Sequence, residues 1–357
     1  MKQTVRIGII GMGWMGKIHA KWAQTIEGCK LVAVCDGNQE KLAGYREKYG
    51  VDVYTDYREM IKRDDIDAVY IVTPLTTHYE VAKACLEAGK HVLCEKPMVM
   101  NEDQANSLRQ LVKTSGRKFM IDFIERFTIS SQEAKLAIDQ GQIGKINYIR
   151  GNFRWFMKNH ALKHGAWAFD REQGGGILLE ASVHLWDVLR YWSGQEVVDV
   201  VCVAHENIVN GKPLEDNCVA IANFDDGAIA CIDLSGSLPL NSPTDLRFEI
   251  LGDKGCIYID EFRSYLMVNS EVGYETNPED IVTGVTFPDV MWHSKIEGGA
   301  NRMQREFIRC IREDVNPSPS VEDGARACEI SWAALNSLYS KKLEPVRYGE
   351  QKCVLWK

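Results

Sequence analysis

Two short segments of the chain hold acid, base and imidazole side chains suited to proton transfer. Glu180 and His184 lie four residues apart in a stretch with helical spacing, so we expect one above the other on one helix face. A carboxylate beside an imidazole raises its basicity and holds it in one orientation. Lys96 follows Glu95 directly after an apolar run, and a lysine at a strand end can polarise or protonate a substrate oxygen. Lys96, His184 and Glu180 are therefore candidate catalytic residues. On spacing alone, a solvated lysine and an ordinary pair on a helix surface are the alternatives.

The start of the chain predicts a site for a dinucleotide diphosphate. An apolar run ending at Ile10 leads directly into a GxGxxG turn. The first glycine permits the tight bend, the second lets the backbone approach a pyrophosphate, and the third lets helix and strand pack closely. Free N–H groups at the start of the next helix attract the phosphates. The residues of this turn expected at the cofactor are Gly11, Gly13, Trp14 and Met15.

Asp36 predicts which dinucleotide is bound. It ends a second apolar run, at the position where a carboxylate accepts hydrogen bonds from the hydroxyls of the adenosine ribose. The same carboxylate repels a 2′-phosphate, and the next three residues carry no charge to offset this repulsion. We expect the side chain of Lys41 to point outward. NAD is therefore the expected cofactor, and NADP is the less favoured one.

Two further strand ends belong to the expected cofactor site. One apolar run ends at Thr73 and another at Cys94, and ligands of an α/β sheet bind at the carboxyl edge of its strands. The residues assigned to the cofactor for this reason are Thr73, Pro74, His78, Glu95 and Lys96. His78 is equally compatible with a surface position on the following helix. Pro97 is a candidate for a cis peptide bond.

The elements that must position these residues change in type along the chain. In the first third, apolar strands alternate with amphipathic helices, which indicates a parallel sheet. Its strands are predicted near 5–10, 31–35, 52–54, 68–73, 91–94 and 118–122. Residues 146–157 and 197–268 show longer alternating strands, which indicates an antiparallel sheet of about six strands with one face covered. Helices are predicted at 129–140, 177–192, 299–313 and 322–341, and an irregular segment at 270–298.

Composition narrows the classes of function. The chain has 357 residues, of which 45% are hydrophobic and 26% charged, as in an ordinary globular enzyme. A net charge of −8 without a basic block argues against a nucleic-acid partner, and no apolar run reaches membrane-spanning length. The 11 cysteines include no CxxC pair, so we expect free thiols in the cytoplasm rather than disulfides. No compact ligand motif supports a metal site.

Together these motifs resemble the Gfo/Idh/MocA family, founded on glucose–fructose oxidoreductase and inositol dehydrogenase. The motifs that carry the resemblance are the GxGxxG turn, Thr73-Pro74 with the downstream His78, Glu95-Lys96-Pro97, Arg126-Phe127 and the triple glycine before His184. The resemblance implies an α/β fold with an N-terminal Rossmann parallel sheet and a C-terminal α/β domain with a large, open, mostly antiparallel sheet. We place these domains at residues 1–124 and 125–357, the second also serving substrate binding and oligomerisation.

The resemblance also implies roles for individual residues. Lys96 matches the active-site lysine of the family and His184 its catalytic histidine. Most relatives have Asp where this chain has Glu180, so this residue supports His184, holds a substrate hydroxyl, or does both. We predict that Lys96, His184 and Glu180 are catalytic, with Glu180 acting mainly on His184. Aromatic rings with interspersed donors before the glycines suit a sugar. The residues expected at the substrate are Arg126, Arg154, Trp155, His160, Trp167, Glu180 and His184.

We therefore predict NAD-dependent oxidation or reduction at a carbinol carbon of a sugar, glycoside or inositol-type polyol, with a proton relay through His184 and Lys96. One alternative is a redox-neutral reaction in which the cofactor oxidises a glycoside, an elimination follows, and the product is reduced again. Another is a dinucleotide-binding regulator without turnover. If helices cover one face of the antiparallel sheet, the other face is a natural subunit interface, so we expect a homodimer or homotetramer.

Overall fold

The computed structural model describes residues 4–156, 170–174, 176–209, 212–239, 242–263, 265–270, 283–286 and 298–355. The chain forms two compact units, Met1–Asp122 with Ala300–Cys328, and Phe123–Gly299 with Glu329–Lys357. The sequence analysis assigned everything after residue 124 to the second domain, and residues 300–328 depart from that assignment. They join the first unit because helix α10 (Gly299–Glu313) packs on its sheet, where Phe307 meets the ring of Tyr70.

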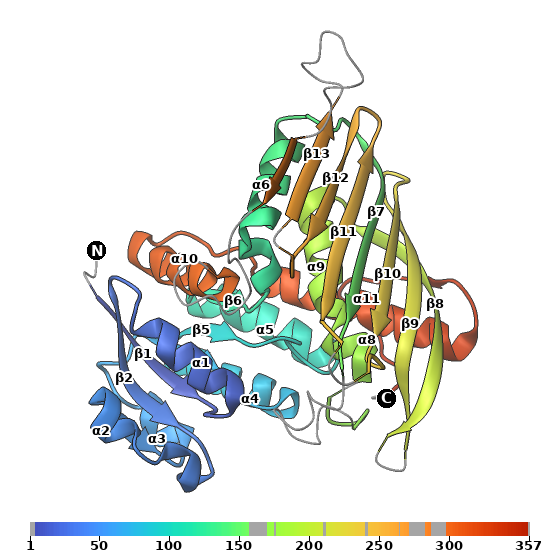
Figure 1. Ribbon diagram of the computed structural model, residues 1–357. Coiled ribbons are helices and arrows are strands. Elements are labelled where there is room, and N and C mark those ends of the chain that lie inside the picture. Colours follow the sequence, from blue (N-terminus) through green and yellow to red (C-terminus); the bar gives the residue numbers. More distant parts are fainter. Residues whose placement is uncertain are drawn as a thin grey trace. The chain divides into compact units, whose positions relative to one another are not determined.

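The first unit contains a parallel sheet in the order β3-β2-β1-β4-β5-β6 (Figure 1). Its strands are β1 (Val5–Ile10), β2 (Cys29–Cys35), β3 (Asp52–Tyr54), β4 (Ala68–Ile71), β5 (His91–Cys94) and β6 (Phe119–Ile121). Every residue of β4 is fully buried, as expected for a parallel strand covered on both faces. The order reverses direction between β1 and β4, where an open α/β sheet binds its ligand. The predicted Rossmann sheet is confirmed.

Short helices connect these strands. They are α1 (Trp14–Ala23), the 3₁₀ helix η1 (Gln39–Leu42), α2 (Tyr45–Tyr49), α3 (Tyr57–Ile61), α4 (Leu75–Glu87) and α5 (Glu102–Ser115). Helix α1 begins directly after the glycine turn, and α4 begins directly after Pro74. Both helices therefore present their N-terminal ends at the carboxyl edge of the sheet.

The second unit contains a nine-stranded sheet in the order β14-β13-β12-β11-β7-β10-β9-β8-β15. Its strands are β7 (Ile146–Arg154), β8 (Val197–Val209), β9 (Lys212–Phe224), β10 (Ile229–Ser235), β11 (Asp245–Gly252), β12 (Gly255–Asp260), β13 (Tyr265–Ser270), β14 (Thr283–Thr286) and β15 (Glu344–Pro345). All neighbouring strands are antiparallel except β7 and β10, which are parallel. The expected mostly antiparallel sheet is confirmed. Strand β14 lies within the segment that was expected to be irregular.

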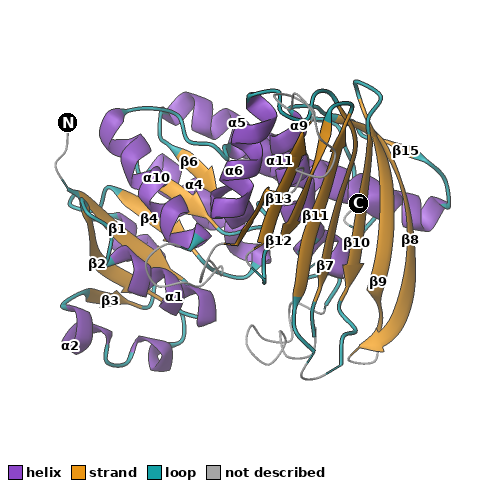
Figure 2. Cartoon of the chain, turned by 45° about the horizontal axis from the view of Figure 1, so that its top comes forward, coloured by secondary structure: helices purple, strands orange, loops and turns teal. Residues whose placement is uncertain are grey.

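Helices cover one face of this sheet. The elements of the unit outside the sheet are η2 (Ile124–Phe127), α6 (Ile129–Asp139), α8 (Gly176–Glu180), α9 (Ser182–Ser193) and the later part of α11 (Val321–Ser340). A Cβ on Gly151 of β7 would meet Leu185 of α9, so odd-numbered residues of β7 face the helices. The opposite face of strands β8 to β12 carries no helix among the described residues (Figure 2).

One predicted helix differs from the observed structure. The stretch expected as a single helix over 177–192 is divided into α8 and α9, with Ala181 between them. The hydroxyl of Ser182 donates to the carbonyl of Leu178, and the His184 N–H bonds to Ala181 instead of Glu180. A serine hydroxyl that bonds back to the preceding turn bends a helix. No described helix is long and apolar enough to span a membrane.

Candidate active site

The glycine turn has the form that a bound diphosphate requires. Gly11 has φ +97°, and a Cβ there would lie 2.3 Å from the carbonyl oxygen of Val72. A Cβ on Gly16 would lie 1.9 Å from the carbonyl oxygen of Gly11, so both positions exclude larger residues. Gly13 has no atom within 4 Å of its Cβ position, and no side chain caps the first turn of α1. The backbone is therefore open to a phosphate where the helix N–H groups attract one.

Asp36 lies at the end of β2 beside this turn. Its carboxylate accepts hydrogen bonds from the N–H groups of Met12 at 2.8 Å and Asn38 at 2.9 Å. Each carboxylate oxygen keeps a second lone pair that a ribose hydroxyl can use. Lys41 does not point outward as expected, because its Nζ lies 3.5 Å from Asp36 Oδ2. Lys41 lies in η1, and the opposite charge of the Asp36 carboxylate attracts its ammonium group.

His78 joins two of the predicted cofactor segments. It is 1% exposed, so the surface position considered for it is wrong. Its Nδ1 lies 2.8 Å from the carbonyl oxygen of Pro97, and its Nε2 lies 2.8 Å from that of Thr73. Burial lowers the pKa of His78. The imidazole therefore ties the turn after β4 to the turn after β5.

Glu95 and Lys96 form the turn after β5, and the Lys96–Pro97 bond is cis as predicted. The Glu95 carboxylate is directed inward, where Oε1 lies 3.0 Å from His19 Nε2 and Oε2 accepts from the Lys96 N–H at 3.3 Å. The side chain of Lys96 is half-buried at the carboxyl edge of the sheet. The turn is thus fixed by one histidine at Glu95 and by another at Pro97.

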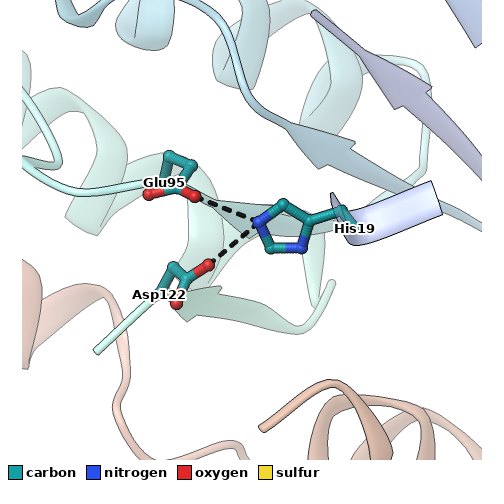
Figure 3. A group of neighbouring side chains, drawn as sticks. All are labelled: His19, Glu95 and Asp122. Atoms are coloured by element: carbon teal, nitrogen blue, oxygen red, sulfur yellow. Dashed lines mark hydrogen bonds and ion pairs between the residues drawn. The ribbon is translucent and has the colours of Figure 1, made fainter. Parts of the chain in front are cut away.

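The sequence analysis missed His19 and Asp122, which meet Glu95 in the first unit (Figure 3). His19 Nε2 lies 3.2 Å from Asp122 Oδ2, and both side chains are almost fully buried. Asp122 follows β6 in the same way that Asp36 follows β2 and Glu95 follows β5. An acidic residue directly after a strand is thus a recurring pattern in the sequence, and this pattern could have identified Asp122. The three side chains are close enough to hold a metal ion, although hydrogen bonding alone also accounts for them.

In the second unit, His184 lies at the start of α9 and is 6% exposed. Its Nδ1 lies 3.4 Å from Oε1 of Glu125, a carboxylate that is itself 1% exposed. The ring of Phe123 meets the imidazole edge-on at 6.1 Å between centroids. The carboxylate seen against the histidine is therefore Glu125. Glu180 ends α8, on the other side of Ala181 from His184, and its predicted place beside the imidazole stays a prediction.

Arg126 is bound to the same helix. Its Nε lies 2.7 Å from Asp187 Oδ2 and its Nη2 lies 2.5 Å from Oδ1, in a buried bidentate pair. Its guanidinium also lies 4.8 Å above the centre of the Tyr191 ring. Arg126 therefore anchors η2 on α9, one turn beyond His184, and its planar group is engaged with protein atoms.

The other expected substrate residues are dispersed. Arg154 pairs with Asp233 and Asp245 on the sheet face opposite α9, so the structure does not bring it to His184. The indole of Trp155 is buried and packs on Phe153 at 4.6 Å. His160 and Trp167 lie in residues 157–169, outside the described residues.

Comparisons with known proteins support the same assignment for both units. Residues 5–123 match the family described as oxidoreductases with an NAD-binding Rossmann fold, and residues 131–258 match the Gfo/Idh/MocA C-terminal domain. The chain is 30% identical to myo-inositol 2-dehydrogenase of Thermotoga maritima over 350 residues, covering 96% of this chain and 99% of that protein. It is 28% identical to the scyllo-inositol 2-dehydrogenase (NAD(+)) of Bacillus subtilis, covering 94% and 95%.

A solved structure agrees over the same length. The levoglucosan dehydrogenase in complex with NADH superimposes with a TM-score of 0.86 at 25% identity, covering 97% of this chain and all of that one. The expectation of an NAD-binding Rossmann domain followed by a large-sheet domain is therefore confirmed.

Proposed function

This chain belongs to the Gfo/Idh/MocA family of oxidoreductases, and on that premise we propose that it is an NAD-dependent dehydrogenase of a cyclic polyol. The substrate is an inositol, sugar or glycoside that reacts at one secondary hydroxyl. The names of two similar proteins, myo-inositol and scyllo-inositol 2-dehydrogenase, support this substrate class. Such polyols carry no charge, which is compatible with a chain whose net charge is −8.

The observation that carries the proposal is the place of Lys96 relative to the glycine turn. A dinucleotide lies across a Rossmann sheet at the point where strand order reverses, here between β1 and β4. Asp36 at the end of β2 marks the adenosine half. The turns after β4 and β5 would then hold the nicotinamide half, and Lys96 stands directly after β5. This position would put a cation beside the reacting carbon, which supports Lys96 as a catalytic group.

NAD, when bound, would supply the acceptor for the hydride of the carbinol carbon. The Lys96 ammonium donates a hydrogen bond to the oxygen on that carbon and stabilises the charge that develops as its proton leaves. The His184 imidazole accepts the proton. In the reverse direction the same two groups return a proton to the carbonyl oxygen.

Glu125 serves the reaction through His184. Proton transfer turns the imidazole into an imidazolium, and a carboxylate 3.4 Å away favours that charged form. Phe123 limits rotation of the ring, and the Arg126–Asp187 pair holds η2 in place against α9. Glu125 therefore takes the orienting role that the sequence analysis gave to Glu180. We assign Glu180 to the substrate, which is the other role that the sequence analysis considered for it.

The proposal includes assembly of the chain into a homo-oligomer. Four large apolar side chains on the uncovered face of the second sheet are exposed, namely Val203, Val219, Ile221 and Ile229. Val203 is the strand partner of Val219, and Ile221 pairs with Cys231, so these residues form one continuous patch. A second copy of the chain, related by two-fold symmetry, would cover the patch.

The test is a screen of inositols, aldoses and glycosides with NAD at alkaline pH, followed by absorbance of NADH. We expect NADH to form with at least one cyclic polyol, and Lys96→Ala to lower kcat by roughly 10²-fold while NADH binding persists. Product without net NADH from a glycoside would instead identify the redox-neutral reaction. NADH binding without any turnover across the panel would contradict a dehydrogenase.

A further inference from the structure

Three side chains from separate segments of the first unit converge on one nitrogen atom. His19 comes from α1, Glu95 follows β5 and Asp122 follows β6 (Figure 3). The carboxylates approach His19 Nε2 to 3.0 Å and 3.2 Å. The side chains of His19 and Asp122 are 1% and 3% exposed, and that of Glu95 is 12% exposed. Water therefore does little to compensate their charges.

The surroundings of the imidazole are rich in hydrogen-bond acceptors. Two carboxylates face Nε2, and the Gln304 amide lies 2.9 Å from Nδ1. The amide oxygen of Gln304 is buried without a hydrogen-bond partner among the described residues, and a half-turn of the amide brings it to Nδ1. An imidazolium donates from both nitrogens and satisfies all three groups. A neutral imidazole has a single N–H and removes the positive charge that the two buried carboxylates share.

We propose that His19 is a positioning residue that carries a positive charge and thereby holds Glu95, and with it the Glu95-Lys96-Pro97 turn. Asp122 is its buried counter-ion and keeps the imidazole charged. This inference rests on the proposed function, because that function makes Lys96 catalytic. It adds a reason for the position of Lys96, because the charged His19 holds Glu95, the residue directly before it.

The pKa shifts of the three side chains agree with a positively charged His19. Burial alone would lower the pKa of His19, but the hydrogen bonds to Asp122 and Glu95 outweigh it and raise the pKa to about 9. Burial, together with the Glu95 charge, raises the pKa of Asp122 to about 6. Burial opposes ionisation of Glu95, yet the bond from His19 lowers its pKa to about 2. At neutral pH the cluster therefore holds an imidazolium between ionised carboxylates.

Other titratable groups face the cluster, but they do not supply the positive charge that His19 gives to both carboxylates. Lys96 and His78 act on Glu95 from the turn and from α4, and Tyr70 of β4 and Cys94 of β5 face Asp122. Both Tyr70 and Cys94 have a pKa raised by burial and stay neutral. Among these neighbours only Lys96 can offer Glu95 a second full positive charge. Loss of the imidazolium would therefore draw the Lys96 ammonium towards Glu95 and away from substrate.

The test uses the full-length protein with the variants His19→Gln and Asp122→Asn, and His91→Gln as control. His91 stands at the other end of β5 and accepts a hydrogen bond from the Lys118 N–H, outside the proposed machinery. We expect His19→Gln to lower kcat by about 10²-fold, the loss seen when a catalytic group moves by about 1 Å, with NADH affinity changed only a few-fold. His91→Gln should retain wild-type kcat.

Asp122→Asn keeps the imidazole and removes its counter-ion, so the charge of His19 is lost at lower pH. The alkaline limb of its kcat profile should therefore move to lower pH, which a loss of packing alone would not produce. NMR of ¹⁵N-labelled histidines tests the charge without any substrate. The spectrum of the wild-type protein at pH 8 should show the signals of one protonated imidazole, and these signals should be absent from His19→Gln. A neutral His19 at pH 8, or one equivalent of zinc in the purified protein that His19→Gln loses, would overturn the inference even if the dehydrogenase activity is found.

Discussion

At the scale of single residues, the two proposed catalytic groups differ in how they are supported. Lys96 is fixed through its neighbours, because His19 holds Glu95 and His78 holds Pro97. His184 is supported directly by Glu125 and Phe123. The sequence motifs predicted Lys96 and His184, because each stands at a recognisable strand or helix end. They did not predict Glu125, His19 or Asp122, because contact between residues far apart in the chain leaves no local spacing pattern.

The identity of the carboxylate that charges His184 is the first prediction at this scale. Glu125→Gln should lower kcat and move the acid limb of the kcat/KM profile to lower pH, because the imidazolium loses its nearest counter-ion. Glu180→Gln should raise KM and leave the acid limb in place, as expected for a substrate contact. Measured pH profiles of both variants decide the matter. An unmoved limb in Glu125→Gln together with a moved one in Glu180→Gln would restore the role first expected for Glu180.

Cofactor preference is the second prediction, and Lys41 changes how it should be tested. The wild-type protein should prefer NAD, because Asp36 repels a 2′-phosphate. Asp36→Ser should shift the ratio of kcat/KM towards NADP, since Lys41 is then free to pair with the phosphate. The double variant Asp36→Ser with Lys41→Ala should lose most of that gain. Equal use of both cofactors by the wild type would refute the assignment.

At the scale of elements, the strands were the most predictable part of the structure. Runs such as Val69 to Ile71 are buried on both faces, and a continuous apolar run has no other stable place in a chain of this composition. The break between α8 and α9 was not predictable from periodicity. It involves a hydrogen bond from the Ser182 hydroxyl to the carbonyl of Leu178, and a hydrophobic pattern does not specify such a bond. The position of residues 300–328 in the first unit was also missed, since an amphipathic helix does not specify which sheet it covers.

The buried Arg126–Asp187 ion pair, which joins η2 to α9, gives a prediction at this scale. Asp187→Ala should lower the free energy of unfolding by about 3–5 kcal/mol, because it leaves the buried Arg126 guanidinium without its partner. Asp139→Ala is a matched control, since it removes the partner of Lys135 in an exposed pair on α6 and should cost less than about 1 kcal/mol. Chemical denaturation of both variants measures the difference. Equal losses would show that the buried pair contributes no special support to the His184 helix.

At the scale of the whole molecule, the uncovered face of the large sheet predicts self-association. Val203→Asp combined with Ile221→Asp should convert the oligomer into monomers, because charges would have to be buried in the apolar patch. Leu136→Asp, which alters an equally exposed apolar residue on α6, should leave the assembly intact. Light scattering coupled to size-exclusion chromatography measures the mass. A monomeric wild-type protein, or an oligomer that survives the double variant, would refute this interface.

The central claim is that hydrogen moves from a carbinol carbon of a polyol to the cofactor held by the first unit. The most direct measurement uses a substrate from the screen that carries deuterium on its ring carbons, with unlabelled NAD. Mass spectrometry should find one deuterium in the reduced cofactor for each molecule of ketone formed, and Lys96→Ala should slow its appearance without changing that ratio. Ketone or eliminated product formed without deuterium in the cofactor pool would contradict the account.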